Sequence, residues 1–367
     1  MKKFFSQFFI FVLYLIAGGM CGYFGIAFFK DYDLSIITAF YVLGAFYICI
    51  FLQVIIHECG HLIFGLLSGY QFLSIRFYNF MWVKRNDKIV FKMNKVPGTL
   101  GQCLMSIDHY QEPFPFVLYH LGGVFNNLIS ALISFIICLI IHNPYLQSFC
   151  FSLGIFGLIS ALTNGLPLNI GIDNDAKNVF NMMKYPITKY ACFQQLKIIE
   201  YMSKGYSLKD INEDNFTIYS NEDLTHNLCM SITAFYCLRE IDLSHYQKAY
   251  DIANHILNQN IQMEDNTIYL LKNIVLYILI LTDPQNPKIN NIRDKKYLKM
   301  AKLLKRDLTT LKIEYAYQLL SCHNPVKAKK ILEQFHKACL THPYLGEIES
   351  ETRQIEMIQN LYKEKSL

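Results

Sequence analysis

Three titratable side chains, His57, Glu58 and His61, interrupt the apolar run "FLQVIIHECGHLIFGLL". In a helix, positions i and i+4 lie on one face, so His57 and His61 can present two imidazole nitrogens to one tetrahedral zinc ion. Glu58 lies beside them, where its carboxylate can take a proton from water that the metal acidifies and later deliver it to a leaving amine. The residue types and their spacing therefore predict a hydrolytic zinc site.

The competing interpretation is a chance arrangement of ordinary core residues, a risk that any short motif carries. The setting of this motif argues against it. A charged group at the bilayer centre costs at least about 2.5–3.5 kcal/mol on insertion scales, so ionisable residues there are retained mainly where they are functional. We therefore favour the metal site.

The composition indicates a membrane protein. Of 367 residues, 53% are hydrophobic and only 17% are charged, which is more apolar than an average soluble protein. Four stretches are long and apolar enough to cross the bilayer as helices: roughly residues 4–29, 36–68, 114–141 and 146–168. From about residue 185 onward, charges of both signs alternate with amphipathic helical patterns, which predicts a soluble helical domain.

The distribution of Lys and Arg predicts the orientation. Lys2 and Lys3 precede the first span, and six Lys or Arg residues lie between the second and third spans. The other two loops, 30–35 and 142–147, hold only Lys30. By the positive-inside rule, a multi-pass protein of the cell membrane with both termini in the cytoplasm is expected. The "HECGH" motif then lies toward the cytoplasmic end of the second span.

Cysteine usage and charge exclude several classes of protein. The eleven cysteines form no CxxC pair, which argues against a disulfide scaffold and a thiolate zinc site and indicates a reducing compartment. The net charge of +5 is spread without a basic, aromatic-rich stripe, so nucleic acid is not an expected partner. The N-terminal apolar stretch is too long for a secretory signal, and Met20 disfavours the alternative, a lipoprotein-type cleavage before Cys21.

A third zinc ligand must come from elsewhere, because a catalytic zinc usually has three protein ligands and one open position. The fourth span ends in "ALTNGLPLNIGIDNDAKN", where Asn164 and Pro167 break the helix and Asp173 and Asp175 follow. Freed backbone groups at membrane depth are tolerated where they line a cavity or are buried in protein. The plain alternative is a helix stop followed by a polar loop. On these grounds either aspartate is a candidate.

Three motifs in this order, "HECGH", "GGVFNN" and the stretch from Asn164 to an aspartate, resemble the site-2 protease family of intramembrane zinc metalloproteases. The resemblance implies a metalloendopeptidase that uses Zn²⁺. It also implies the roles of five residues: His57, His61 and Asp175 as zinc ligands, Glu58 as general base and Asn127 as a catalytic-site residue that helps position the site.

The resemblance covers roughly residues 36–180, and the sequence departs from the family pattern within it. Ala176 follows Asp175 where the family usually has glycine, and Val124 stands where a proline is usual. "NDAKN" still matches the family's "NDG-x-N" except for the glycine. The match therefore favours Asp175 over Asp173 as the third ligand.

The resemblance also implies the substrates, which are membrane-embedded or membrane-associated peptides. A short peptide precursor or a pre-trimmed substrate is favoured because no periplasmic-type binding domain is inserted between the spans. Two alternatives stay open. One is another membrane metalloprotease with a glutamate as third ligand, for which the sequence offers no convincing residue. The other is a non-catalytic membrane scaffold or immunity-type protein that retains a degenerate zinc-protease fold, whose function would survive the loss of Glu58.

Between the second and third spans, alternating residues around the turn "KRNDK" predict a β-hairpin at the membrane surface. The simpler interpretation is that this segment is an ordinary cytoplasmic loop. An unpaired strand edge, however, offers main-chain hydrogen bonds to an extended substrate. We expect the Pro97-Gly98 turn and the following "GTLGQCLM" to lie near the metal.

Together these patterns predict an all-α polytopic membrane protein with about four transmembrane helices, a membrane-associated β-hairpin and a C-terminal α-helical soluble domain. The predicted domains are an N-terminal helix with its loop (1–35), a metalloprotease core (36–184) and a cytoplasmic helical domain (185–367). The last has a faint likeness to tetratricopeptide hairpins and suits binding of a cytoplasmic protein partner. Its apolar run "LKNIVLYILILT" is too short to span, so a buried core helix is expected.

Overall fold

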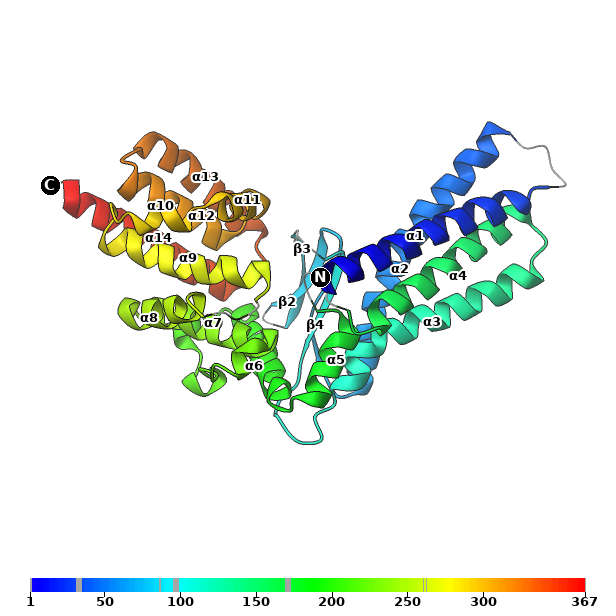
Figure 1. Cartoon of the computed structure of the whole chain (residues 1–367), viewed down its shortest axis with the longest axis horizontal. Helices are drawn as coiled ribbons and strands as arrows, with labels where there is room; N and C mark the ends of the chain where they lie inside the picture. The colour runs from blue at the N-terminus through cyan, green and yellow to red at the C-terminus, as the bar shows by residue number, and fades with distance from the viewer. Residues whose placement is uncertain are drawn as a thin grey trace. The chain divides into compact units, whose positions relative to one another are not determined.

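The computed structural model describes residues 2–30, 35–85, 87–94, 99–168, 173–259, 261 and 263–366 (Figure 1). The chain divides into two compact units. The first comprises residues 1–78 and 98–186, and the second comprises residues 79–97 and 187–367. Each unit has a hydrophobic core of its own.

Four long apolar helices dominate the first unit: α1 (Lys2–Ala27), α2 (Ile36–Leu67), α3 (Phe116–Ile140) and α4 (Pro144–Gly165). Each is long and apolar enough to cross a membrane. Large apolar side chains such as Phe40 and Leu139 project from them with little cover, which suits contact with lipid rather than water. The predicted polytopic membrane fold with about four spans is confirmed.

Helix caps set where two of these spans begin. The Ser35 hydroxyl accepts a hydrogen bond from Thr38 N at the start of α2. The Asn143 side chain accepts from the first amides of α4, and Pro144 occupies the first helical position, where a missing N–H costs nothing.

The spans pack through small residues. Helix α2 contacts both α3 and α4, and α1 packs on α4 and α2. Where α2 crosses α3, a Cβ on Gly60 would lie 2.3 Å from the Gly122 carbonyl oxygen, and one on Gly122 would lie 2.5 Å from Gly60 O. The two backbones therefore touch at the level of the "HECGH" motif, as small residues allow in membrane helix pairs.

A four-stranded antiparallel sheet follows α2. Its strands are β1 (Gln71–Phe77), β2 (Phe80–Arg85), β3 (Lys88–Met93) and β4 (Gly101–Ser106), in the order β3-β2-β1-β4. The predicted "KRNDK" hairpin is the β2–β3 pair. The prediction did not include β1 and β4, which pair with each other across a bulge near Phe72.

Helices α6 to α14 make up most of the second unit. Their bounds are α6 (Ile187–Ser203), α7 (Asn227–Asp242), α8 (Tyr246–Leu257), α9 (Asp265–Thr282), α10 (Lys288–Ile292), α11 (Lys295–Leu303), α12 (Leu308–Ala316), α13 (Pro325–Thr341) and α14 (Leu345–Ser366). Helix α13 begins at the predicted Asn324-Pro325 boundary, where the Asn324 side chain caps the Lys327 amide. The β2–β3 hairpin belongs to this unit, and Arg85 donates to Pro343 O at 2.8 Å.

Helix α9 meets the length and composition criterion for a fifth span, because it extends beyond the predicted apolar run. Its surroundings differ from those of the spans. Within its most apolar window 61% of the residues are buried, against 17% for α1 and 50% for α4, the least and the most buried of the four spans. Helix α9 also packs on α7, α8 and α12 of its own unit. These contacts make α9 the central core helix of the second unit, as the sequence predicted.

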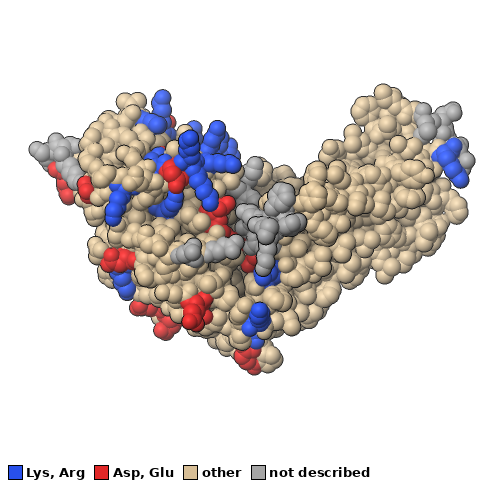
Figure 2. All heavy atoms as spheres, viewed as in Figure 1, with Lys and Arg blue, Asp and Glu red and all other residues tan. Residues whose placement is uncertain are grey.

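The two units differ in surface charge. Figure 2 shows Lys and Arg side chains gathered over α11 and α13, whereas the surface of the long apolar helices carries almost no charge. The exposed cationic residues of this surface are Lys295, Lys296, Lys299, Lys302, Lys305, Arg306, Lys327, Lys329, Lys330 and Lys337. A solvated surface of this kind fits a water-exposed helical unit attached to membrane spans.

Candidate metal centre

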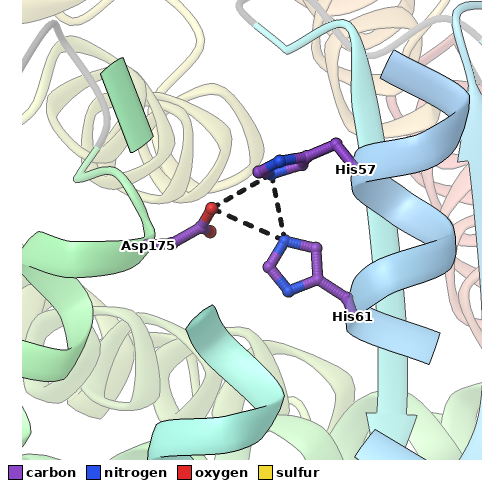
Figure 3. Close-up of side chains that lie close together, drawn as sticks. All are labelled: His57, His61 and Asp175. Atoms are coloured by element: carbon purple, nitrogen blue, oxygen red, sulfur yellow. Dashed lines mark hydrogen bonds and ion pairs between the residues drawn. The ribbon is translucent and has the colours of Figure 1, made fainter. Parts of the chain in front are cut away.

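Helix α2 presents His57 and His61 one turn apart, and both imidazoles face Asp175, the first residue of α5 (Asp175–Lys184) (Figure 3). His57 Nε2 lies 3.1 Å from His61 Nε2 and 3.0 Å from Asp175 Oδ2. His61 Nε2 lies 3.5 Å from the same carboxylate oxygen. Among the described residues, these three side chains make up the one group arranged to hold a metal ion.

Hydrogen bonds on the far side of each ring set the protonation of the imidazoles. His57 Nδ1 lies 2.6 Å from Asn127 Oδ1, and His61 Nδ1 lies 2.8 Å from the Tyr119 carbonyl oxygen. Both partners are oxygen acceptors, so each Nδ1 carries the proton. Both Nε2 atoms therefore point a lone pair at the carboxylate of Asp175. A cation is the species that stabilises three converging lone pairs in a buried site.

The spacing fits zinc. With zinc–nitrogen bonds of about 2.0–2.1 Å, two ligands of a tetrahedral ion lie about 3.3 Å apart. The three observed separations, 3.0, 3.1 and 3.5 Å, fall on both sides of that value. Two imidazoles and one carboxylate also leave a fourth position open, as in catalytic rather than structural zinc sites.

Asn174 fixes the position of Asp175. Its side-chain nitrogen donates to Thr163 O and Leu166 O at 2.7 and 2.6 Å, and its side-chain oxygen accepts from Lys177 N at 3.0 Å. The last bond caps α5, while the first two tie the cap to the end of α4.

The other polar residues predicted near this position lie elsewhere. Asp173 Oδ2 accepts a hydrogen bond from Asn181 at 3.3 Å and is not part of the metal-type cluster. The Asn164 side chain donates back to Ser160 O of its own helix at 3.0 Å. The helix break predicted at Asn164 is present, because α4 ends at Gly165.

Glu58 is buried between α2 and the start of β4. A Cβ on Gly101 would lie 2.2 Å from Glu58 Oε1, so the carboxyl group rests directly on the Gly101 backbone. The buried Arg76 side chain holds this strand end by donating to Gly101 O at 3.2 Å and to Tyr78 O at 2.6 Å. Gly101, the fourth residue of the "GTLGQCLM" segment, thus lies against Glu58, whereas the Pro97-Gly98 turn lies outside the described residues.

Gly123 of the "GGVFNN" motif leaves room for the His57 ring. A Cβ there would lie 2.5–2.7 Å from three atoms of the imidazole, closer than van der Waals contact allows. Glycine is therefore required at this position if His57 is to face Asp175.

We expect Gly123→Ala to displace the His57 ring, to destabilise the protein by about 1–3 kcal/mol through overpacking and to weaken zinc binding. Gly44→Ala, in the same span as His57, is the matched control because nothing lies within 4 Å of its Cβ. Thermal unfolding with a zinc titration measures both effects. Equal zinc affinities for the two variants would contradict this steric role.

Three residues that shape the cluster were not predicted. Gln53, Tyr119 and Asn174 act through hydrogen bonds to Asn127, to His61 and across the end of α4. Two of them had a local signal. Gln53 is a buried amide in an apolar span, and Asn174 precedes an acidic residue at a helix start. The role of Tyr119 depends on its main-chain carbonyl, which no side-chain pattern indicates.

The fold and this cluster define a membrane protein with three side chains arranged to hold a metal ion. A family model described as "Peptidase family M50" matches residues 45–342, most of the chain. The chain therefore belongs to peptidase family M50, the site-2 protease family of zinc metalloproteases, and is a multi-pass membrane protein. No match was found among the curated proteins or among the solved structures.

Proposed function

We propose that the chain is a zinc-dependent intramembrane endopeptidase with His57, His61 and Asp175 as metal ligands and Glu58 as general base. One observation carries the proposal: two Nε2 lone pairs and one carboxylate oxygen converge within 3.0–3.5 Å among apolar helices. Ionisable groups at such a depth are costly, which favours a functional reason for them.

The chemistry divides between the metal and the chain. Zinc bound at this position supplies an electrophile that acidifies water and polarises a peptide carbonyl. Glu58 holds the proton removed from the attacking water and delivers it to the leaving amine. Asn127 orients His57 by accepting a hydrogen bond from its Nδ1–H, and the surrounding helices exclude bulk water.

The substrate is a membrane-embedded or membrane-associated peptide held in an extended conformation. Strand β4 supports this proposal, because it ends the strand order and leaves one edge without a neighbouring strand in the described sheet. Its first residue, Gly101, lies against Glu58. A substrate strand added to this edge gains main-chain hydrogen bonds while its scissile bond approaches the general base.

The distribution of Lys and Arg supports a location and an orientation in the cell. We propose a cell-membrane protein whose sheet and helical second unit face the cytoplasm, because Lys and Arg concentrate there and are sparse in the opposite loops. The second unit, with its exposed cationic surface, is available to bind a cytoplasmic protein partner.

Cysteine labelling tests this orientation. An impermeant maleimide should leave the exposed Cys322 and an introduced Lys88→Cys unmodified in intact cells and should label both after permeabilisation. His142→Cys, in the loop between α3 and α4, is the matched control and should be labelled from outside. Labelling of Lys88→Cys in intact cells would overturn the topology.

Reconstitution tests the activity itself. In lipid vesicles, the purified protein should cut a transmembrane peptide, lose this activity when a chelator removes the metal, and recover it when zinc returns. The scaffold or immunity-type alternative predicts no cleavage at any zinc concentration and a cellular function that survives the loss of Glu58.

A further inference from the structure

Gln53 lies one helical turn before His57 on α2 and is 1% exposed in the middle of an apolar span. A buried amide is costly unless both of its ends are hydrogen-bonded, so its partners matter. Its Nε2 donates to Leu153 O of α4 at 2.8 Å and to Ser130 Oγ of α3 at 3.0 Å. Its Oε1 accepts from Asn127 Nδ2 at 2.6 Å.

Donor and acceptor roles along this chain of hydrogen bonds can be assigned in only one way. The Leu153 carbonyl can only accept, so the nitrogen of the Gln53 amide must face it and the oxygen must face Asn127. Asn127 then has to present its own nitrogen to Gln53. This leaves Asn127 Oδ1 facing His57 Nδ1 at 2.6 Å, where it can only accept. The main-chain oxygen of Leu153 thus favours the Nδ1 tautomer of His57 through two amides, and the main-chain oxygen of Gln53, which accepts from Asn127 Nδ2 at 3.2 Å, supports the same orientation.

We propose that Gln53 is a positioning residue that, through Asn127, keeps the proton of His57 on Nδ1 and its Nε2 lone pair free for the metal. The inference rests on the proposed zinc site but concerns a residue outside its ligands and outside the three motifs. Without the Gln53 side chain, Asn127 Nδ2 keeps only its longer bond to the Gln53 main-chain oxygen, at 3.2 Å, in place of the 2.6 Å bond to Oε1. The Asn127 amide is then held less firmly with its oxygen toward His57, which weakens the preference for the Nδ1 tautomer.

The packing around Gln53 is consistent with this role. A Cβ on Gly157 of α4 would lie 2.9 Å from Asn127 O and 3.0 Å from Gln53 Nε2. Glycine at this position therefore brings α4 close enough for the Leu153 carbonyl to reach Gln53. This chain of hydrogen bonds links α2, α3 and α4 next to the Nδ1 side of His57.

The first test is the zinc affinity of the full-length protein, measured by competition with a chromophoric chelator. Gln53→Met, which keeps length and removes the amide, should weaken zinc binding about 10–100-fold, the usual effect of losing a group that orients a ligand. With cobalt in place of zinc, its visible absorption bands should also shift. Ser130→Ala is the matched control, since it removes the contacts of the Ser130 hydroxyl with Gln53 and with Asn127 O but leaves the hydrogen bonds from Leu153 O through the two side-chain amides to His57 intact.

A double-mutant cycle separates positioning from general stability. If Gln53 acts through Asn127, adding Gln53→Met to Asn127→Ala should weaken zinc binding no further, whereas independent structural effects would add. Gln53→Asn, too short to reach both partners, serves in the same cycle if the methionine variant does not fold. Unchanged zinc affinity in a folded Gln53 variant, or additive losses, would overturn the positioning role alone. A wild-type protein that binds no zinc would overturn the proposed function as well.

Discussion

Glu58→Gln should retain zinc and fold while losing about 10²–10⁴-fold in the rate of peptide cleavage, the usual contribution of a general base. The amide has nearly the shape of the carboxyl group but cannot hold the proton taken from water. Glu58 is 6% exposed and rests on Gly101, so the variant fits the same space. Cleavage of a transmembrane peptide in vesicles and zinc content per chain are the two measurements.

Glu333→Gln is the matched control for Glu58→Gln, because it makes the same chemical change on the exposed surface of α13. It should leave both cleavage and zinc content unchanged. A Glu58→Gln protein that cleaves at the wild-type rate would remove Glu58 from the mechanism. A variant that loses both zinc and fold would instead assign Glu58 a structural role.

Asp175→Asn and Asp173→Asn should differ in their effects on zinc affinity and on cleavage. Asp175 Oδ2 lies 3.0 Å from His57 Nε2 and 3.5 Å from His61 Nε2, so replacing it removes the anionic ligand. Zinc affinity should fall by more than the about 10–100-fold typical of losing a residue that only orients a ligand, and cleavage should fall with it. Asp173→Asn should spare both, because Asp173 pairs with Asn181 instead.

Zinc titration of the two purified variants distinguishes the aspartates. If Asp173→Asn loses zinc and Asp175→Asn retains it, the third ligand is Asp173 and the assignment must be reversed. His57→Ala and His61→Ala should each lose most of the zinc, which shows that the titration reports this site.

The spans and the motif helix could be predicted because their signals are local. The hydrophobicity of 36–68 and the i, i+4 spacing of His57 and His61 depend on one helix alone. The third ligand could not be fixed in this way, since Asp175 reaches the histidines only through the end of α4 and the cap that Asn174 makes. The resemblance to a family, rather than residue spacing, favoured Asp175.

The sheet was predicted only in part for a related reason. The β2–β3 hairpin is local and has a polar turn, whereas β1 and β4 pair across more than twenty intervening residues. Four consecutive residues of β1, Leu73 to Arg76, are buried, so this strand lacks the alternation that marks a half-exposed strand. The buried Arg76 also makes β1 hard to recognise from sequence, because a charged residue is rarely expected in the protein interior.

Helix α9 shows the limit of hydropathy as a guide to membrane spans. Its length and composition meet the criterion for a span, yet its side chains Leu271, Leu276 and Ile280 are fully buried among neighbouring helices. An apolar helix in a soluble core and one in lipid can have the same composition. The shortness of the apolar run predicts a core helix, but the helix itself has 18 residues, so its packing on α7, α8 and α12 rather than its length places it in the core.

X-ray absorption at the zinc edge of the purified wild-type protein tests the central claim most directly. We predict one zinc per chain, with nitrogen and oxygen neighbours at about 2.0–2.1 Å and the outer-shell scattering of two imidazoles. All eleven cysteines are free thiols, so sulfur ligands are chemically available to a competing site. A shell of sulfur at about 2.3 Å, or protein that purifies without zinc and binds none when it is added, would contradict a zinc centre built from His57, His61 and Asp175.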